Sequence, residues 1–508
     1  IAPLNRFLPT RLRTMSSSTA PAAPPASGLD GYFGIARRGS SIAQEVRGGL
    51  VTFFTMAYII ALNPLIIGTT PDKDGNLVSG LSAADPANIG PTIAMVAAAT
   101  ALIAGIMTIL MGVVGRFPLA LATGLGLNAM LAYVIAPQVT WPQAMGLVVW
   151  EGIIILVLVL TGFREAVFRA VPRPLRTGIA VGIGLFITLV GLADAGIVRP
   201  GNPLLQMGVN NHLLGWPMAV FMLGLIVLVL LFVRRTPGAM LITIVGMTVV
   251  AVILEAVLKI GAKLPDGTNP TGWMLNVPAI EGSFFSLPDL SLLGRVDLFG
   301  AFTVGPEVTI AMLMTVFALL LADFFDSMGT IVAVGAEGNL LGSDGNPERT
   351  REILVVDSVA AIAGGLGSVS SNTSYIESAA GVGEGARTGF ASVVTGIAFL
   401  LSLFLAPLVK LVPSEAAAPA LVFVGFLMLS QVIHVDWTDP EEGFPAFITL
   451  IAMPFTYSIT VGIGAGFIFY VLIKLARGKA REVHPLLYVV AAAFVLFFAE
   501  GVIGALIS

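Results

Sequence analysis

Long apolar runs separated by short polar stretches fill the chain from residue 49 onward. A run of about 20 apolar residues is long enough to cross the hydrocarbon core of a bilayer as a helix. Seven such runs fall in the first half, at 49–69, 90–114, 125–136, 144–162, 174–193, 213–233 and 238–258. After a polar loop, seven more follow at 304–335, 353–366, 374–382, 388–409, 417–434, 444–457 and 459–476. The pattern predicts an all-α polytopic membrane protein with 14 transmembrane segments. A last apolar stretch at 485–507 either spans the membrane or lies at its interface.

The composition agrees with a membrane protein. Of 508 residues, 56% are apolar and 11% are charged, whereas a soluble domain carries about 25% charged residues. The net charge of -4 is too small to indicate nucleic acid as a partner. The chain has no cysteine, which excludes disulfides and thiol catalysis, and its three histidines are scattered. We therefore expect neither a metal nor a cofactor.

Residues 1–28 differ from the rest of the chain. Between Ser16 and Gly28 the sequence is rich in Ser, Ala and Pro and shows no apolar period. Such a composition is typical of disorder, and the stretch lacks the uninterrupted apolar core of a signal peptide. We predict a disordered N-terminal tail.

Basic residues cluster at alternate ends of the predicted segments, and cytoplasmic loops of membrane proteins are enriched in Lys and Arg. The clusters are Arg37, Arg38 and Arg47; Arg164, Arg169, Arg173 and Arg176; Arg234 and Arg235; and Lys474, Arg477, Lys479 and Arg481. All four fall on the cytoplasmic side if the N-terminus is cytoplasmic. The pattern therefore predicts that orientation.

The two halves resemble each other. Pro172 and Pro413 follow similar sequences and stand 241 positions apart, and a Val-Gly pair at 181 recurs at 424. An odd number of segments per half inverts the second copy in the membrane. Inverted repeats of this kind are typical of secondary transporters.

The third and tenth segments are interrupted. The third contains Phe117 and Pro118 before Gly124-Leu-Gly-Leu-Asn128, and the tenth runs through polar residues to Glu377. Each reads as a short extended piece followed by a half-helix. Non-helical backbone at membrane depth is tolerated only where protein or a cavity satisfies it. The pattern predicts that the two breaks meet at one internal site.

Acidic residues lie inside these apolar regions. Asp323 and Asp326 stand in the eighth segment, and Glu377 stands in the tenth. A carboxylate in the bilayer centre costs about 2.5–3.5 kcal/mol even on insertion scales, so such residues usually serve a ligand or a proton. Asp323 is one turn before Asp326 on nearly the same helix face. These acids are the main candidates for a transport site.

Three motifs give the chain a resemblance to a known family. They are Gly-Leu-Asn-Ala at 126–129, Asp-Phe-Phe-Asp-Ser-Met-Gly-Thr at 323–330 and Thr-Ser-Tyr-Ile-Glu-Ser-Ala-Ala-Gly at 373–381. They resemble the AzgA-like purine permeases of the nucleobase–cation symporter and nucleobase/ascorbate transporter group. The resemblance covers nearly the whole chain. It implies two inverted repeats of seven segments, a core domain that holds the substrate, and a gate domain that packs against it.

The implied domain boundaries follow the segments. The tail at 1–28 precedes core segments 1–4 at 29–162, gate segments 5–7 with a loop at 163–302, core segments 8–11 at 303–410, gate segments 12–14 at 411–482, and the C-terminal stretch at 483–508. Related permeases are proton symporters that often dimerise, so the resemblance implies a homodimer in the plasma membrane.

The resemblance also assigns roles to residues. Asp326 and Glu377 match the family's substrate-binding acids, and Asn128 matches a family Asn. Thr55, Ser374 and Ser378 are further candidates for substrate binding. The candidates for proton coupling are Asp323, Asp326 and Glu377.

Each assignment has a structural alternative. The acids could bind backbone N–H groups of the broken helices, and Thr or Ser hydroxyls could bond carbonyls of their own helix. Glu151 is expected to pair within the core domain, and Asp357, placed near a segment start, is expected at a helix end or between domains. Gly-rich strings such as 462–466 lie inside apolar runs, where close helix packing is the expected role.

The leading functional hypothesis is proton-coupled uptake of the purine bases adenine, guanine or hypoxanthine, with the core moving against the gate like an elevator. One alternative is a facilitative or anion carrier of the same fold, as in sulfate and bicarbonate carriers, although two acids disfavour an anion. Another is a permease for xanthine or uracil. An intramembrane enzyme would need a nucleophile or metal constellation, and none is evident, so we expect no enzymatic activity.

Overall fold

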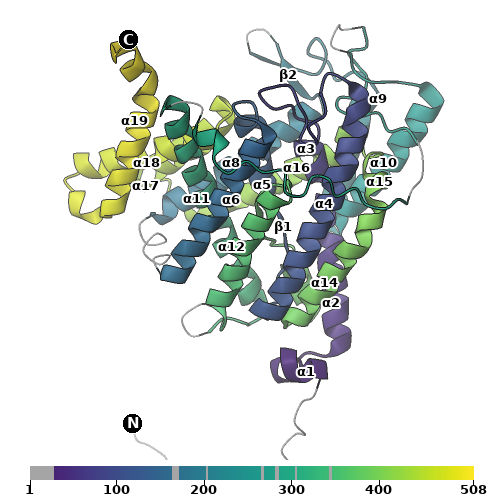
Figure 1. Cartoon of the computed structure of the whole chain (residues 1–508), viewed down its shortest axis with the longest axis horizontal. Coiled ribbons are helices and arrows are strands. Elements are labelled where there is room, and N and C mark those ends of the chain that lie inside the picture. Colours follow the sequence, from purple (N-terminus) through teal and green to yellow (C-terminus); the bar gives the residue numbers. More distant parts are fainter. Residues whose placement is uncertain are drawn as a thin grey trace, which may run out of the picture.

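Apolar segments of this length fold into helices because only helices satisfy every backbone polar group within one segment in lipid. The computed structural model describes residues 28–162, 171–201, 204–264, 268–280, 285–303, 306–342 and 346–507. The expected tail and two of the orientation residues, Arg164 and Arg169, lie outside these ranges. The described chain is mostly helical, as predicted (Figure 1).

The first half contains α1 (Gly28–Phe33), α2 (Ile42–Met56), α3 (Ile59–Ile67), α4 (Ile89–Leu110), the π-helix η3 (Met111–Gly115), β1 (Leu121–Thr123), α5 (Leu125–Met130), the π-helix η4 (Leu131–Ile135), α6 (Trp141–Thr161), α8 (Arg173–Asp194), β2 (Val198–Pro200), β3 (Leu205–Met207), α9 (Trp216–Val233) and α10 (Ala239–Leu258). The second half contains α11 (Pro306–Glu337), α12 (Thr350–Leu366), β4 (Asn372–Ser374), α13 (Ser378–Gly383), α14 (Gly389–Ser402), α15 (Ala406–Val409), α16 (Ser414–Leu429), α17 (Pro440–Thr456), α18 (Ile459–Ala476) and α19 (Pro485–Ile507).

These helices account for all 14 predicted segments. Within the described residues, 10 helical stretches are long and apolar enough to cross a membrane. The other four predicted segments are the shorter helices α5 with η4, α12, α13 and α17. The stretch at 485–507 forms α19, which packs against α18 and α11 at the outer edge of the molecule (Figure 1).

The two interrupted segments meet near the middle of the molecule. Strand β1 pairs with β4 in antiparallel register, Leu121 opposite Ser374 and Thr123 opposite Asn372. Each strand is followed by a short helix, α5 after β1 and α13 after β4. This confirms the predicted extended pieces, and the antiparallel pairing is what an inverted repeat produces. Figure 1 shows β1 surrounded by helices on all visible sides.

The remaining helices form two groups. In the core, α4 packs against α14 and α6 packs against α12, and in the gate α8 packs against α16 and α17. Glycines permit these close approaches. A Cβ at Gly112 would collide with the carbonyl oxygen of Gly389 across the α4–α14 side of the core, and one at Gly184 would collide with Met428 across α8 and α16. A Cβ at Gly466 would likewise collide with Thr449, which confirms that the Gly-rich string at 462–466 serves helix packing.

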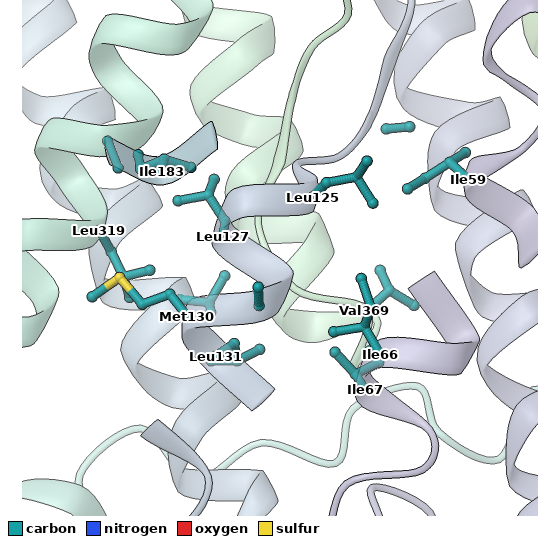
Figure 2. Packing of buried hydrophobic residues seen from close by; sticks show 14 of the residues in the cluster. Ile59, Ile66, Ile67, Leu125, Leu127, Met130, Leu131, Ile183, Leu319 and Val369 are labelled. Carbon is teal, nitrogen blue, oxygen red and sulfur yellow. The ribbon is translucent and has the colours of Figure 1, made fainter. Parts of the chain in front are cut away.

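Helix α5 lies where core and gate meet. Figure 2 shows its buried side chains between Ile59, Ile66 and Ile67 of α3 on one side and Ile183 of α8 on the other. All are part of one continuous hydrophobic core. A Cβ at Gly126 would collide with the side chain of Ile183. The segment that carries a predicted site residue therefore contacts the gate directly.

Candidate transport site

The acidic pair of α11 is divided between two environments. Asp323 is 1% exposed, whereas Asp326, one turn later, is exposed. Glu377, which immediately precedes α13, is half-buried. Asp326 and Glu377 lie within electrostatic range of each other. The structure thus brings the two acids predicted to bind substrate within electrostatic range of each other and buries Asp323 one turn before Asp326.

Two residues of segment 1 contact Glu377. The helix breaks between α2 and α3, and the hydroxyl of Tyr58 at this break donates a hydrogen bond to Oε1 of Glu377. Thr55 Oγ1 donates to the carbonyl oxygens of Val51 and Thr52 at 3.0 and 2.9 Å, and it reaches the carbonyl oxygen of Glu377 at 3.4 Å. The Thr55 hydroxyl is therefore mainly bonded to its own helix.

Tyr58 was not among the residues predicted from the sequence. It stands alone in the apolar run Met56–Ile60 and is 1% exposed. A buried tyrosine normally finds a partner for its hydroxyl. The sequence did contain a signal for this role, because Tyr58 is the single phenol in an otherwise apolar run.

A second group of acids, Glu151, Asp323 and Asp357, lies near β4. Ser371 Oγ donates to Glu151 Oε1 at 3.3 Å, and Ser374 Oγ donates to Asp357 Oδ1 at 2.7 Å. The carboxyl groups of Glu151 and Asp323 lie within electrostatic range of each other. The expected pairing of Glu151 within the core is therefore confirmed. All three acids are less than 5% exposed.

The expectation for Asp357 was wrong. Asp357 lies in the middle of α12 rather than at a helix end, and its bond to Ser374 stays inside the core. The sequence indicated a start near residue 353, but the helix begins a turn earlier, at Thr350. The start was misplaced because the first turn is polar and charged, so it does not belong to the apolar run.

Thr373 connects β4 to the buried acids. Its hydroxyl lies 2.7 Å from Ser327 Oγ, and Ser327 reaches Asp323 Oδ1 at 3.5 Å. Strand β4 is thus linked through hydroxyl groups to two of the buried acids, Asp323 and Asp357.

Asn128 is fully buried at the start of α5. Its Nδ2 donates to Thr123 Oγ1 at 3.2 Å, and its Oδ1 finds no partner among the described residues. Neither amide atom of Asn372, which is paired with Thr123 across the strands, finds one there either. An unsatisfied buried amide is costly, so these groups are candidates for a ligand or water that completes their hydrogen bonds.

The hydroxyls of the two serine candidates, Ser374 and Ser378, form hydrogen bonds to other groups of the protein. Ser378 Oγ accepts the N–H of Ala120 at 3.0 Å, which ties α13 to the chain just before β1. Ser374 donates to Asp357, as described above. Across the described ranges, no group of three or more His, Cys, Asp or Glu side chains is arranged to hold a metal ion.

A buried acid also locks the core outside this site. Glu45 of α2 is 0% exposed and accepts the N–H groups of Arg387, Thr388 and Ala391 at 2.8, 3.3 and 3.2 Å. These donors surround the first turn of α14, whose N–H groups have no partner within the helix. Segment 1 is thereby fixed to segment 11.

Comparison with known proteins places this site in a family. The model of the permease family Xan_ur_permease matches residues 43–465, which include both acids, both strands and the breaks. The chain belongs to this permease family. The permease is 36% identical over 473 residues to the guanine/hypoxanthine permease PbuG of Bacillus subtilis, covering 92% of this chain and 98% of the relative. It is 35% identical over 471 residues to the adenine permease AdeP of Escherichia coli, covering 92% of this chain and 95% of the relative.

Solved structures share the fold of the permease. The transmembrane domain of the cyanobacterial bicarbonate transporter BicA superposes with a TM-score of 0.55 at 15% identity, over 83% of this chain and 96% of that one. The murine anion transporter Slc26a9 in its inward-facing state gives a TM-score of 0.57 at 12% identity, over 86% and 69% of the two chains. These likenesses confirm the inverted-repeat architecture of core and gate.

Proposed function

We propose that the permease takes up purine nucleobases by proton symport, with the core moving against the gate like an elevator. The observation that carries this proposal is the placement of Asp326 and Glu377. They come from two different segments, neither is fully buried, and they lie within electrostatic range of each other. The names of the relatives, which are guanine/hypoxanthine and adenine permeases, support the choice of a purine.

Purine chemistry matches an acidic site. A purine base presents N–H donors on both rings, and a carboxylate that accepts them forms charge-assisted hydrogen bonds. Two acids on opposite sides of a base could each accept one donor. A site for an anion such as bicarbonate would instead need cationic or neutral groups, because two carboxylates repel it.

The buried acids support proton coupling. Glu151, Asp323 and Asp357 are buried near one another, and Asp323 lies one turn from Asp326. Several carboxyl groups this close in a dry interior cannot all be ionised, so at least one holds a proton. We propose that Asp326 and Glu377 bind the base and that Asp323 carries the coupled proton.

The packing of α5 supports movement of the core. Its apolar side chains meet the gate at Ile183 within one hydrophobic cluster (Figure 2). We propose the core as 29–162 and 303–410 and the gate as 163–302 and 411–482. We propose a cytoplasmic N-terminus, because the Arg and Lys clusters then fall on the cytoplasmic side. We also propose a homodimer in the plasma membrane, as the resemblance to the purine permeases implies.

Substrate counterflow tests the proposed substrate class. Purified permease in liposomes preloaded with unlabelled hypoxanthine or adenine should take up radiolabelled purine, and Glu377→Gln should strongly reduce this uptake at low purine concentration. Bicarbonate and sulfate should not compete. Uptake of a labelled anion that purines do not inhibit would overturn the proposal. If only xanthine or uracil competed, the substrate would be that base rather than adenine, guanine or hypoxanthine.

A further inference from the structure

We propose that Tyr58 is a positioning residue that orients the carboxylate of Glu377 for the base and favours its charged form. This inference rests on the proposed function, because it gives Glu377 the role of binding a purine. Tyr58 and Glu377 are separated by 319 positions and meet only in the folded core. The bond joins the break in segment 1 to the break in segment 10.

Two contacts from segment 1 fix Glu377 together. Thr55 Oγ1 reaches the carbonyl oxygen of Glu377 at 3.4 Å, and the Tyr58 hydroxyl donates to its side-chain Oε1. The Tyr58 ring is 1% exposed, so it cannot swing into water and keep its hydrogen bond there. A half-buried carboxylate with one oxygen held by a rigid ring has few orientations left. Preorganisation of this kind raises affinity because less freedom is lost when a ligand binds.

The hydrogen bond from Tyr58 favours the ionised form of Glu377. A phenol O–H donates into an ionised carboxylate, and such charge-assisted bonds are stronger than neutral ones. Protonation of Glu377 would weaken that bond and remove an acceptor for the purine N–H. Tyr58 therefore favours the ionised form that binds the base.

Asp326 and Tyr375 lie near Glu377, and the charged groups on the surrounding elements have contacts of their own. Asp326 of α11 and Tyr375, which lies between β4 and α13, are both within electrostatic range of Glu377. On α2, Glu45 is bound to the start of α14 and Arg47 pairs with Glu384 at 3.0 Å. Arg176 of α8 lies over the ring of Phe325 on α11, with its Cζ 5.9 Å from the ring centroid. All of these groups remain when only the Tyr58 hydroxyl is removed, so their effects cancel in a comparison of variants.

The test compares Tyr58→Phe with Tyr375→Phe by calorimetric purine binding across a pH series. Tyr375 is the matched control because it is also buried, but its hydroxyl donates to the backbone carbonyl of Thr123 at 2.6 Å. Loss of a hydrogen bond to a charged group costs about 1.5 kcal/mol or more, which is roughly tenfold in affinity. We expect Tyr58→Phe to weaken binding by about this factor and to move the acid-side loss of affinity to higher pH. Tyr375→Phe should change thermal stability without moving that pH profile.

A double-mutant cycle separates the two proposals. In the Glu377→Gln background, the added Tyr58→Phe change should weaken binding by much less than it does alone, because the two residues act through one bond. An unchanged affinity and pH profile in Tyr58→Phe, with binding lost in Glu377→Gln, would overturn the positioning role and leave the proposed function intact. Full binding by Glu377→Gln would instead contradict the proposed site itself.

Discussion

The hydroxyl of Tyr133 in η4 donates a hydrogen bond of 3.2 Å to Oδ2 of Asp194 at the end of α8. Tyr133 belongs to segment 3 of the core and Asp194 to segment 5 of the gate. The ring of Tyr133 also packs edge-on against Tyr457 of the gate, with the ring centroids 6.2 Å apart. An elevator movement of the core must break this contact.

A cross-link across this contact should stop transport. The chain has no cysteine, so Tyr133→Cys with Asp194→Cys introduces the only two thiols. Joining them with a short bifunctional thiol reagent should abolish purine uptake, and a cleavable linker should restore it on reduction. The control is Arg38→Cys with Glu348→Cys. Both residues belong to the proposed core domain, and their side chains form an ion pair of 3.3 Å. Full transport by the cross-linked Tyr133–Asp194 pair would rule out relative movement at this position.

Removing the charge of Glu377 should weaken purine binding. Glu377→Gln keeps the shape of the side chain but removes its charge, so the expected loss is about 1.5–3 kcal/mol, the range for a hydrogen bond to a charged group. Isothermal calorimetry with adenine, guanine and hypoxanthine measures it. Glu384→Gln is a suitable control, because Glu384 lies beyond α13 and pairs with Arg47 at the surface. Equal affinity in the wild type and Glu377→Gln would remove Glu377 from the site.

The two acids of α11 should separate binding from coupling. Asp326 is exposed beside Glu377, so Asp326→Asn should impair binding and transport together. Asp323 is buried against Glu151, so Asp323→Asn should keep counterflow but lose accumulation driven by a pH gradient. Both assays use the same vesicles. If Asp323→Asn loses counterflow as well, or accumulates substrate normally, the proposed division of roles is wrong.

Glu45 should matter for stability rather than for coupling. Glu45→Ala leaves three N–H groups at the start of α14 without their acceptor, and leaving a buried donor unsatisfied costs about 1–3 kcal/mol. Thermal unfolding in detergent should show a clearly lowered midpoint. Glu352→Ala serves as the control, because its ion pair with Arg349 is partly exposed and such pairs contribute about 0–1 kcal/mol. Equal midpoints for the two variants would contradict the capping role of Glu45.

Much of the architecture could be predicted from the sequence, because a membrane span must be apolar and must satisfy its own backbone hydrogen bonds. Helices of sufficient length must appear as apolar runs, and broken helices reveal themselves by Pro, Gly and polar residues such as those before Asn128 and Glu377. The acids of α11 were recognisable because a carboxylate in an apolar run is costly. The meeting of the two breaks was predicted, but the antiparallel pairing of β1 with β4 was not.

The partners of individual side chains could not be predicted in the same way. Asp323 and Asp326 are one turn apart, yet Asp323 is buried near Glu151 and Asp326 is exposed. Residues three apart on a helix differ in direction enough for their side chains to meet different neighbours. The bond between Tyr58 and Glu377 joins positions 319 residues apart, and no local pattern encodes it. Thr55 and Ser378 were recognised as polar, but only the fold shows that their hydroxyls bind backbone groups.

The central claim is that a proton gradient drives purine transport through this site. The direct measurement is uptake of radiolabelled hypoxanthine or adenine into proteoliposomes under an imposed pH gradient with an acidic exterior. We predict accumulation of the base above its external concentration, which a protonophore collapses to simple equilibration. Equilibration alone, at the same level with and without the gradient, would contradict proton symport.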